Sequence, residues 1–288
     1  MTSSAPPGSA AGVALTRRKE LGLSFLEAGH GTPVVLLHGI PGSALTWATV
    51  GERLAGDYRV VIPDLLGFGR SDPPSGDYYM EAQAHRVREL LGRLDIAELV
   101  LGGHDFGGPI ALTLRRLYPE LRIRALILSA TNLFTDTYVP PPLRLARFPF
   151  FGTPLFWLLA GNRWGLRLMF EAATVQKREV SWDRFRRHLT ASSVDLTRRI
   201  FQRSLGDLET NYRAIETLLP DLGVPTLVLW GDRDPFFGVS VGERSHSSIP
   251  GSVFRVLPKT GHFVPEEQPD RVADEIHEFL AAVTLRCT

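Results

Sequence analysis

The sequence predicts an α/β protein: a mainly parallel β-sheet flanked by helices, with an inserted helical cap. Three observations predict this class. Short apolar runs alternate with helical patterns along most of the 288 residues. Those runs are apolar almost without interruption, as is typical of strands covered on both faces. Between about residues 135 and 219 the strand pattern stops, and helical periods rich in Phe, Trp, Leu and Arg replace it.

Six runs carry the strand signal, at residues 33–37, 58–62, 98–102, 123–128, 226–230 and 253–257. Helices are expected at about 80–94, 107–118, 239–247 and 269–283. The chain then divides into a flexible N-terminal tail (1–20), a first part of the core (21–134), the helical cap (135–219) and a second part of the core (220–288).

The composition excludes several classes of protein. The 32 basic and 31 acidic residues give no concentrated positive charge, so we expect no nucleic-acid binding. The most apolar stretch, 148–160, is broken by Pro and Gly and is shorter than the roughly 20 residues that cross a bilayer, so we expect no membrane binding. The single cysteine, Cys287, excludes a disulfide within the chain. Residues 1–16 lack the pattern of a targeting peptide, and a cytoplasmic protein is expected.

The segment from Leu99 to Leu112 gives the sharpest chemical signal. A strand pattern runs into a turn and a helical pattern leaves it, and Asp105 in the turn has glycine two residues before and two after. Small flanking residues permit the strained strand–turn–helix geometry that presents a nucleophile. The alternative is a structural Asp that caps the following helix.

Three other predicted strands are followed by polar segments. His38-Gly39-Ile40-Pro41-Gly42 follows the first strand, and Gly231-Asp232-Arg233-Asp234 brings two carboxylates to the end of another. Gly261-His262-Phe263 follows the last strand and supplies a glycine-flanked histidine. A carboxylate, a second carboxylate and a histidine thus occur in the order Asp105, Asp234, His262.

These segments, with Asp64-Leu65-Leu66-Gly67-Phe68-Gly69-Arg70-Ser71-Asp72, resemble the α/β-hydrolase superfamily. The similarity is to the branch of epoxide hydrolases and haloalkane dehalogenases with an aspartate nucleophile, and it spans roughly residues 21–283. It implies an α/β-hydrolase fold and a catalytic triad of Asp105, His262 and Asp234, with Asp232 as a turn residue. It also implies an oxyanion hole made by the backbone N–H groups of Ile40 and Phe106.

The chemistry agrees with the resemblance. A carboxylate is ionised at neutral pH, and it can attack saturated carbon to form an alkyl ester. His262, oriented by Asp234, would then activate a water that hydrolyses this ester. No cofactor and no metal are expected, because no His/carboxylate cluster has metal-ligand spacing.

The leaving group decides between the two activities. An epoxide oxygen needs a proton donor, which resembling epoxide hydrolases supply from cap tyrosines. Tyr212, in Asn211-Tyr212-Arg213, fits this role, and Tyr138 is the candidate for a second donor. Haloalkane dehalogenases typically have Trp after the nucleophile and many have Asn in the oxyanion loop, where this chain has Phe106 and Ile40. The sequence therefore favours an epoxide hydrolase.

We expect a small hydrophobic substrate, because the cap segment is rich in aromatic residues. The residues expected to line its pocket are His38, Phe156 and Trp157. His188 is expected at the surface or in a helix. The oligomeric state is left open by the sequence.

Three alternatives remain. The first is a haloalkane dehalogenase. The second is a serine esterase that would use Ser240, in Gly238-Val239-Ser240-Val241-Gly242, with Glu243 as the acid. The third is a non-catalytic protein of this fold that binds a small ligand.

Overall fold

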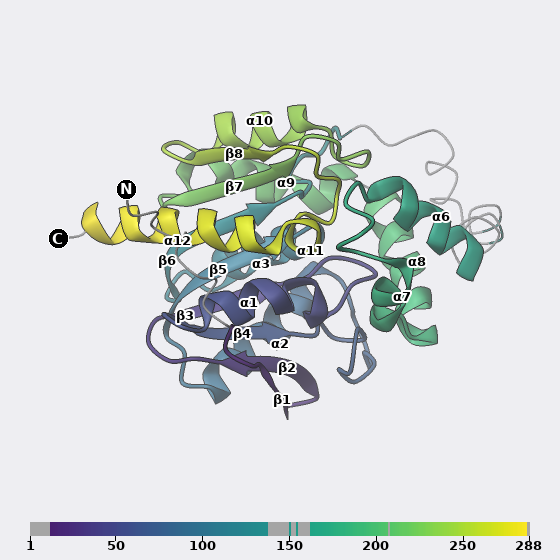
Figure 1. Cartoon of the computed structure of the whole chain (residues 1–288), viewed down its shortest axis with the longest axis horizontal. Coiled ribbons are helices and arrows are strands. Elements are labelled where there is room, and N and C mark those ends of the chain that lie inside the picture. Colours follow the sequence, from purple (N-terminus) through teal and green to yellow (C-terminus); the bar gives the residue numbers. More distant parts are fainter. Residues whose placement is uncertain (1–11, 138–149, 151–153, 155–161, 207, 287–288) are drawn as a thin grey trace, which may run out of the picture.

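A central sheet of eight strands, in the order β1-β2-β4-β3-β5-β6-β7-β8, organises the molecule (Figure 1). The computed structural model describes residues 12–137, 150, 154, 162–206 and 208–286. Strands β1 and β2 join antiparallel, and all pairs from β4 to β8 are parallel. The six predicted strands are β3 (Pro33–Leu37), β4 (Arg59–Pro63), β5 (Glu98–His104), β6 (Arg122–Ser129), β7 (Thr226–Gly231) and β8 (Val253–Leu257). The predicted α/β class is confirmed.

Two N-terminal strands, β1 (Thr16–Glu20) and β2 (Leu23–Ala28), were not predicted. The expectation of a flexible tail up to residue 20 is wrong from Thr16 onward, because this segment pairs with β2. Its sequence TRRKE has no apolar residue and therefore looks like a tail. At the edge of a sheet such residues are favourable, since charged side chains discourage pairing with another chain. Arg17 also reaches the buried carboxylate of Asp64 at 2.6 Å.

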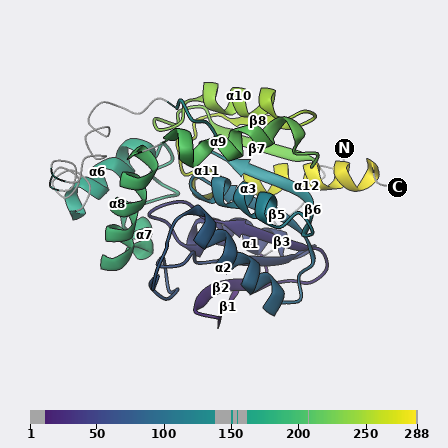
Figure 2. The same cartoon turned by 180° about the vertical axis from the view of Figure 1, so that it is seen from behind.

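Helices cover both faces of the sheet, which explains why its strands are apolar without interruption. In β3, Val34 and Leu36 pack in one hydrophobic cluster with α1 (Ala48–Leu54) and α12 (Pro269–Arg286), in front of the sheet in Figure 1. Val35 and Leu37 pack in the other cluster with α2 (Met80–Arg93), α3 (Gly107–Leu117) and α9 (Leu208–Leu218), in front in Figure 2. Helix α10 (Val239–Ser248) joins β7 to β8.

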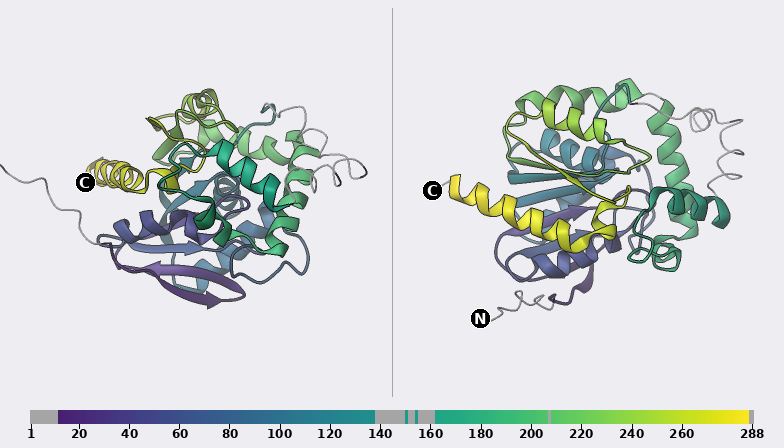
Figure 3. Two further views of the ribbon diagram at one scale, coloured as in Figure 1. Left: turned by 45° about the vertical axis from the view of Figure 1, so that its right-hand side comes forward. Right: turned by 45° about the horizontal axis from the view of Figure 1, so that its top comes forward.

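The segment between β6 and β7 contains the helices α6 (Arg163–Ala173), α7 (Trp182–Phe185), α8 (Ala191–Gly206) and α9, with the short 3-10 helices η3 (Arg186–His188) and η4 (Leu219–Asp221). Helices α6, α7 and α8 stand together beyond one end of the sheet (Figures 1 and 3). Contacts place them over the carboxyl ends of the parallel strands. His188 Nδ1 lies 3.0 Å from Ser43 Oγ, just before η1 (Ala44–Trp47). The His262 N–H donates to the Ala173 carbonyl oxygen at 2.9 Å, before α11 (Val264–Glu267).

Within the described residues, no helix combines the length and the apolar character that crossing a membrane requires.

Candidate active site

Asp105 occupies a sharp turn between β5 and α3. Its φ is +51°, in the left-handed region that costs a non-glycine residue roughly 1–3 kcal/mol. Glycine is required on both sides: a Cβ on Gly103 would lie 2.4 Å from the carbonyl carbon of Gly107, and a Cβ on Gly107 would lie 2.4 Å from the backbone of β3. The Asp105 N–H donates to the Ser129 carbonyl oxygen at 3.1 Å, and Thr131 Oγ1 donates to the Asp105 carbonyl oxygen at 2.6 Å. These contacts hold the Asp105 side chain at the carboxyl edge of the sheet.

His262 lies between two carboxylates. Its Nδ1 donates to Asp234 Oδ2 at 2.9 Å, and its Nε2 lies 3.6 Å from Asp105 Oδ2. The other oxygen of Asp234 accepts from the N–H groups of Phe236 and Phe237 at 2.8 and 3.0 Å. Asp234 is therefore fixed, and it orients the imidazole with Nε2 toward Asp105. The fold thus brings together three side chains that follow β5, β7 and β8.

Two backbone N–H groups also face the Asp105 carboxylate. The Ile40 N–H donates to Asp105 Oδ1 at 2.9 Å. The Phe106 N–H is near enough to the same carboxylate to help lower its pKa. The loop after β3 can approach this closely because residue 39 is glycine: a Cβ on Gly39 would lie 2.4 Å from Asp105 Cβ. Both residues expected in the oxyanion hole therefore lie beside the Asp105 side chain.

His38 orients the Ile40 N–H. Its Nε2 accepts from the Leu65 N–H at 2.9 Å, so its Nδ1 carries the proton and donates to the Gly39 carbonyl oxygen at 2.8 Å. This carbonyl and the Ile40 N–H belong to one trans peptide and point in opposite directions. Because His38 holds the Gly39 carbonyl, the Ile40 N–H points toward Asp105. We expected His38 to line the substrate pocket; instead it is wholly buried, at 0% exposure, and both ring nitrogens bind backbone.

Two tyrosines meet on the side of the site that faces α8 and α9. Tyr212, on α9, is buried, which raises its pKa, and Ser204 and Asn132 are near enough to oppose that rise. Tyr79, the residue before α2, is also buried, and its hydroxyl lies 2.7 Å from Ser204 Oγ. Its ring packs against that of Phe106, with 5.6 Å between the centroids. No sequence signal points to Tyr79, because it lies outside the insertion from which a cap tyrosine is expected.

Comparison with known proteins agrees with this geometry. The family model for the alpha/beta hydrolase fold matches residues 32–269. The chain is a member of the α/β-hydrolase family. Epoxide hydrolase 4 of Mus musculus is 30% identical over 94% of this chain and 80% of the relative, and haloalkane dehalogenase 2 of Mycobacterium tuberculosis is 26% identical over 89% and 90%. Among solved structures, a thermophilic esterase from Thermogutta terrifontis is 31% identical over 95% of this chain and 99% of that one, with a TM-score of 0.70.

Haloalkane dehalogenase DbeA from Bradyrhizobium elkani has a TM-score of 0.80 over 95% of this chain and 99% of that chain. At 20% sequence identity, this similarity concerns the fold. The expected superfamily and branch are therefore confirmed, and the chain is a hydrolase of the α/β-hydrolase fold.

In the site of this α/β-hydrolase, the charges of His262, Asp105 and Asp234 determine the pKa values of His262 and Asp105. Burial by itself lowers the pKa of an imidazole, but the carboxylates of Asp234 and Asp105 outweigh burial and raise the pKa of His262 to about 10. Burial by itself raises the pKa of Asp105, but the adjacent His262 holds it below its usual range. The resting site therefore contains an imidazolium between two carboxylates. His104, whose ring centroid is 5.0 Å from that of His262, is neutral because burial lowers its pKa to about 4.

Further residues hold the loop that carries His262, and sequence reasoning missed them. Glu267 Oε1 accepts from the Gly261 N–H at 3.0 Å, and its Oε2 accepts from the N–H groups of Val175 and Gln176 at 2.8 Å each. Asp232, expected as a turn residue, accepts from the Thr260 N–H at 3.0 Å. These contacts tie the loop after β8 to β7 and to the segment after α6.

His188 also ties the insertion to the core. It lies in η3, so the expectation of a helical position is confirmed, but it is 1% exposed and not at the surface. Its Nε2 lies 3.5 Å from the buried carboxylate of Glu266.

Tyr138, Phe156 and Trp157 lie outside the described residues. Ser240, the alternative nucleophile, is exposed in the first turn of α10 and does not follow a strand directly.

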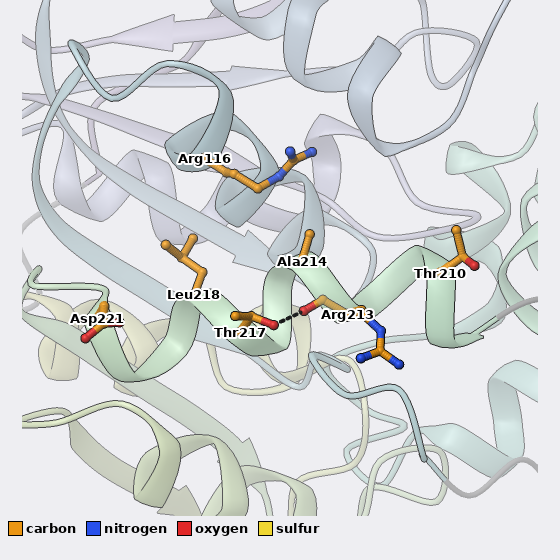
Figure 4. Close-up of a pocket in the computed structure, with 7 residues that line it drawn as sticks. All are labelled: Arg116, Thr210, Arg213, Ala214, Thr217, Leu218 and Asp221. Carbon is orange, nitrogen blue, oxygen red and sulfur yellow. Dashed lines mark hydrogen bonds between the residues drawn. The ribbon is translucent and has the colours of Figure 1, made fainter.

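A surface hollow of about 650 Å³ lies over α9 and the end of α3 (Figure 4). It is lined by Arg116, Thr210, Arg213, Ala214, Thr217, Leu218 and Asp221. None of these belongs to the Asp105 site. Among the described residues, no group of three His, Cys, Asp or Glu side chains is arranged to hold a metal ion.

Proposed function

We propose that the chain is an epoxide hydrolase that acts on small hydrophobic epoxides through an ester of Asp105. The observation that carries the proposal is the buried phenol of Tyr212 near the carboxylate of Asp105. The two groups are close enough that the charge of Asp105 helps burial raise the pKa of Tyr212 well above its usual range. A neutral phenol beside a nucleophilic carboxylate is what opening an epoxide requires.

In the first half-reaction, an Asp105 oxygen attacks an epoxide carbon. A bond forms between them, the carbon–oxygen bond of the epoxide breaks, and its electron pair remains on the departing oxygen. That oxygen takes a proton from a phenol, which becomes a phenolate. His262 is not needed as a base, because Asp105 is already ionised and the imidazole is already protonated.

In the second half-reaction, the ester is hydrolysed. Esterification removes the charge of Asp105, one of the two charges that raise the pKa of His262. The imidazolium can then give its proton to the phenolate. The neutral imidazole next accepts a proton from a water, which attacks the ester carbon. The oxyanion would lie between the N–H groups of Ile40 and Phe106. When the intermediate collapses, the bond from the ester carbon to the diol oxygen breaks, and the diol oxygen takes the proton of the hydroxyl that came from water. The site is left with its carboxylate and its imidazolium.

Halide release is less well supported. A departing halide needs hydrogen-bond donors around it, and the side chains of Ile40 and Phe106 have none. The relatives include both an epoxide hydrolase and a haloalkane dehalogenase, so substrates of both classes belong in the test.

The test is one turnover in oxygen-18 water, after a panel of epoxides, haloalkanes and p-nitrophenyl esters has identified a substrate. The first product should contain oxygen-16 from Asp105, and the peptide that contains Asp105 should gain oxygen-18. The Asp105→Asn variant should form no ester. Immediate appearance of oxygen-18 in the product would mean direct attack by water and would contradict the aspartyl ester. A panel in which only haloalkanes react would contradict the epoxide assignment.

A further inference from the structure

Tyr79 is buried beside the proposed active site without a role in it so far. The sequence offers Tyr212 as the first donor to the departing oxygen, and its candidate for a second donor, Tyr138, lies outside the described residues. The structure brings a second phenol to the same place from the core. The hydroxyl of Tyr79 lies 2.7 Å from Ser204 Oγ, and Tyr79 and Tyr212 are close enough that each affects the pKa of the other. The ring of Tyr79 lies against Phe106, whose N–H faces Asp105.

The charges around the two phenols differ. Tyr212 has the negative charge of Asp105 nearby, which opposes loss of its proton. Tyr79 has the guanidinium of Arg203 over its ring, at 4.5 Å from the centroid. A cation over an aromatic face stabilises negative charge that develops on that ring. Burial raises the pKa of Tyr79 to about 12, and the charge of Arg203 opposes that rise.

We propose that Tyr79 is the second phenol of the ring-opening step: Tyr79 and Tyr212 both hold the departing oxygen, and Tyr79 supplies the proton. This inference rests on the proposed function. In the step, the epoxide carbon–oxygen bond breaks as the bond to Asp105 forms, and the proton of Tyr79 moves to the departing oxygen. Arg203 stabilises the phenolate that remains, and Tyr212 donates a hydrogen bond. The proton held by His262 in the resting site later restores Tyr79.

Two matched pairs of variants test the proposal. Tyr79→Phe removes one hydroxyl of the pair, and Tyr78→Phe makes the same change at the neighbouring, half-buried position. Arg203→Gln removes the cation from Tyr79, and Arg199→Gln removes the cation that lies 4.0 Å from the centroid of Tyr78. The side chain of Arg203 is 44% exposed, so Arg203→Gln should fold even if Tyr79→Phe does not.

The measurement is the rate constant for ester formation with styrene oxide in single turnovers, at several concentrations of the epoxide. Tyr79→Phe should lower the rate constant about 10- to 100-fold, as expected for loss of one donor to a developing oxyanion. Arg203→Gln should lower it about 3- to 10-fold. The half-saturating concentration should change less than about threefold, since the interaction grows only as charge develops. The double variant Tyr79→Phe/Tyr212→Phe should be slower than either single variant.

A folded Tyr79→Phe that is as fast as Tyr78→Phe would overturn the inference, and so would a double variant no slower than Tyr212→Phe. If Tyr79→Phe does not fold, equal rates for Arg203→Gln and Arg199→Gln would overturn it. In these outcomes the wild type still opens the epoxide, so the proposed function survives. A wild type that forms no ester with any epoxide would contradict both.

Discussion

The protonation of His262 depends on two carboxylates at once, and only one of them changes during the proposed reaction. Asp234 is held by two backbone N–H groups and forms no bond to the substrate in the proposed reaction. Asp105 loses its charge when it is esterified. His262 can thus stay protonated and take no part in the first half-reaction, and it can act as a base in the second, because its pKa depends on the charge of Asp105.

His262→Gln should therefore still form the ester and fail to hydrolyse it. Glutamine keeps approximate size and hydrogen bonding but cannot accept a proton from water. Mass spectrometry after incubation with styrene oxide should find the epoxide mass on the peptide that contains Asp105. His30→Gln, the same change at an exposed position, should show no such accumulation. A folded His262→Gln without any ester would mean that His262 is required for the attack itself.

At the scale of elements, the site depends on how the insertion is fastened to the loop after β8. Glu267 accepts hydrogen bonds from Gly261 on one side and from Val175 and Gln176 on the other. Burial raises the pKa of this carboxyl, while the three backbone N–H groups lower it. One side chain thus joins segments that are about 90 residues apart, as the separations of 92 and 91 residues show.

Glu267→Gln should lower the free energy of unfolding by roughly 2 kcal/mol, because one of its two terminal atoms becomes an NH₂ group that cannot accept a hydrogen bond. Urea unfolding followed by circular dichroism measures the change. The matched control is Glu278→Gln, at an exposed position of α12, which should stay within about 0.5 kcal/mol of the wild type. Equal losses in the two variants would show that the Glu267 bridge contributes nothing specific.

The fold buries several histidines near the carboxyl edge of its sheet, and it shifts their pKa values in opposite directions. Burial lowers the pKa of His38 and of His104 to about 4 each, so folding excludes their protons. The carboxylates around His262 raise its pKa to about 10, so folding retains that proton despite burial. Stability must therefore fall on both sides of the ordinary histidine pKa of about 6.5.

Below pH 6.5 the unfolded chain binds protons that folded His38 and His104 reject, and each should cost about 1.4 kcal/mol per pH unit until pH reaches about 4. The contribution of His262 is complete below pH 6.5 and is lost as pH rises toward about 10. Urea unfolding at a series of pH values should give a maximum near neutral or slightly acid pH. In His262→Gln the alkaline decline should become shallower while the acid decline stays. An unchanged alkaline decline in that variant would contradict the role of His262.

The sequence by itself determined the parallel strands and the turn at Asp105. It also contained the order Asp105, Asp234, His262 and the two residues, Ile40 and Phe106, whose N–H groups were expected in the oxyanion hole. The strands and the turn are encoded within a few residues, because apolar periodicity and glycine positions act through short-range sterics. The significance of the residue order and of Ile40 with Phe106 came from the resemblance to the α/β-hydrolase superfamily. The sequence pattern did not predict the strand Thr16–Glu20, since an edge strand needs no apolar residues.

Only the tertiary structure decided which distant side chains complete the site. Tyr79 meets Ser204 across 125 residues, His188 meets Ser43 across 145, and Glu267 reaches the segment after α6. A buried polar group needs a hydrogen-bond partner, and that partner can come from any segment that the fold brings close. The residues next to it in the sequence therefore do not predict which partner it has.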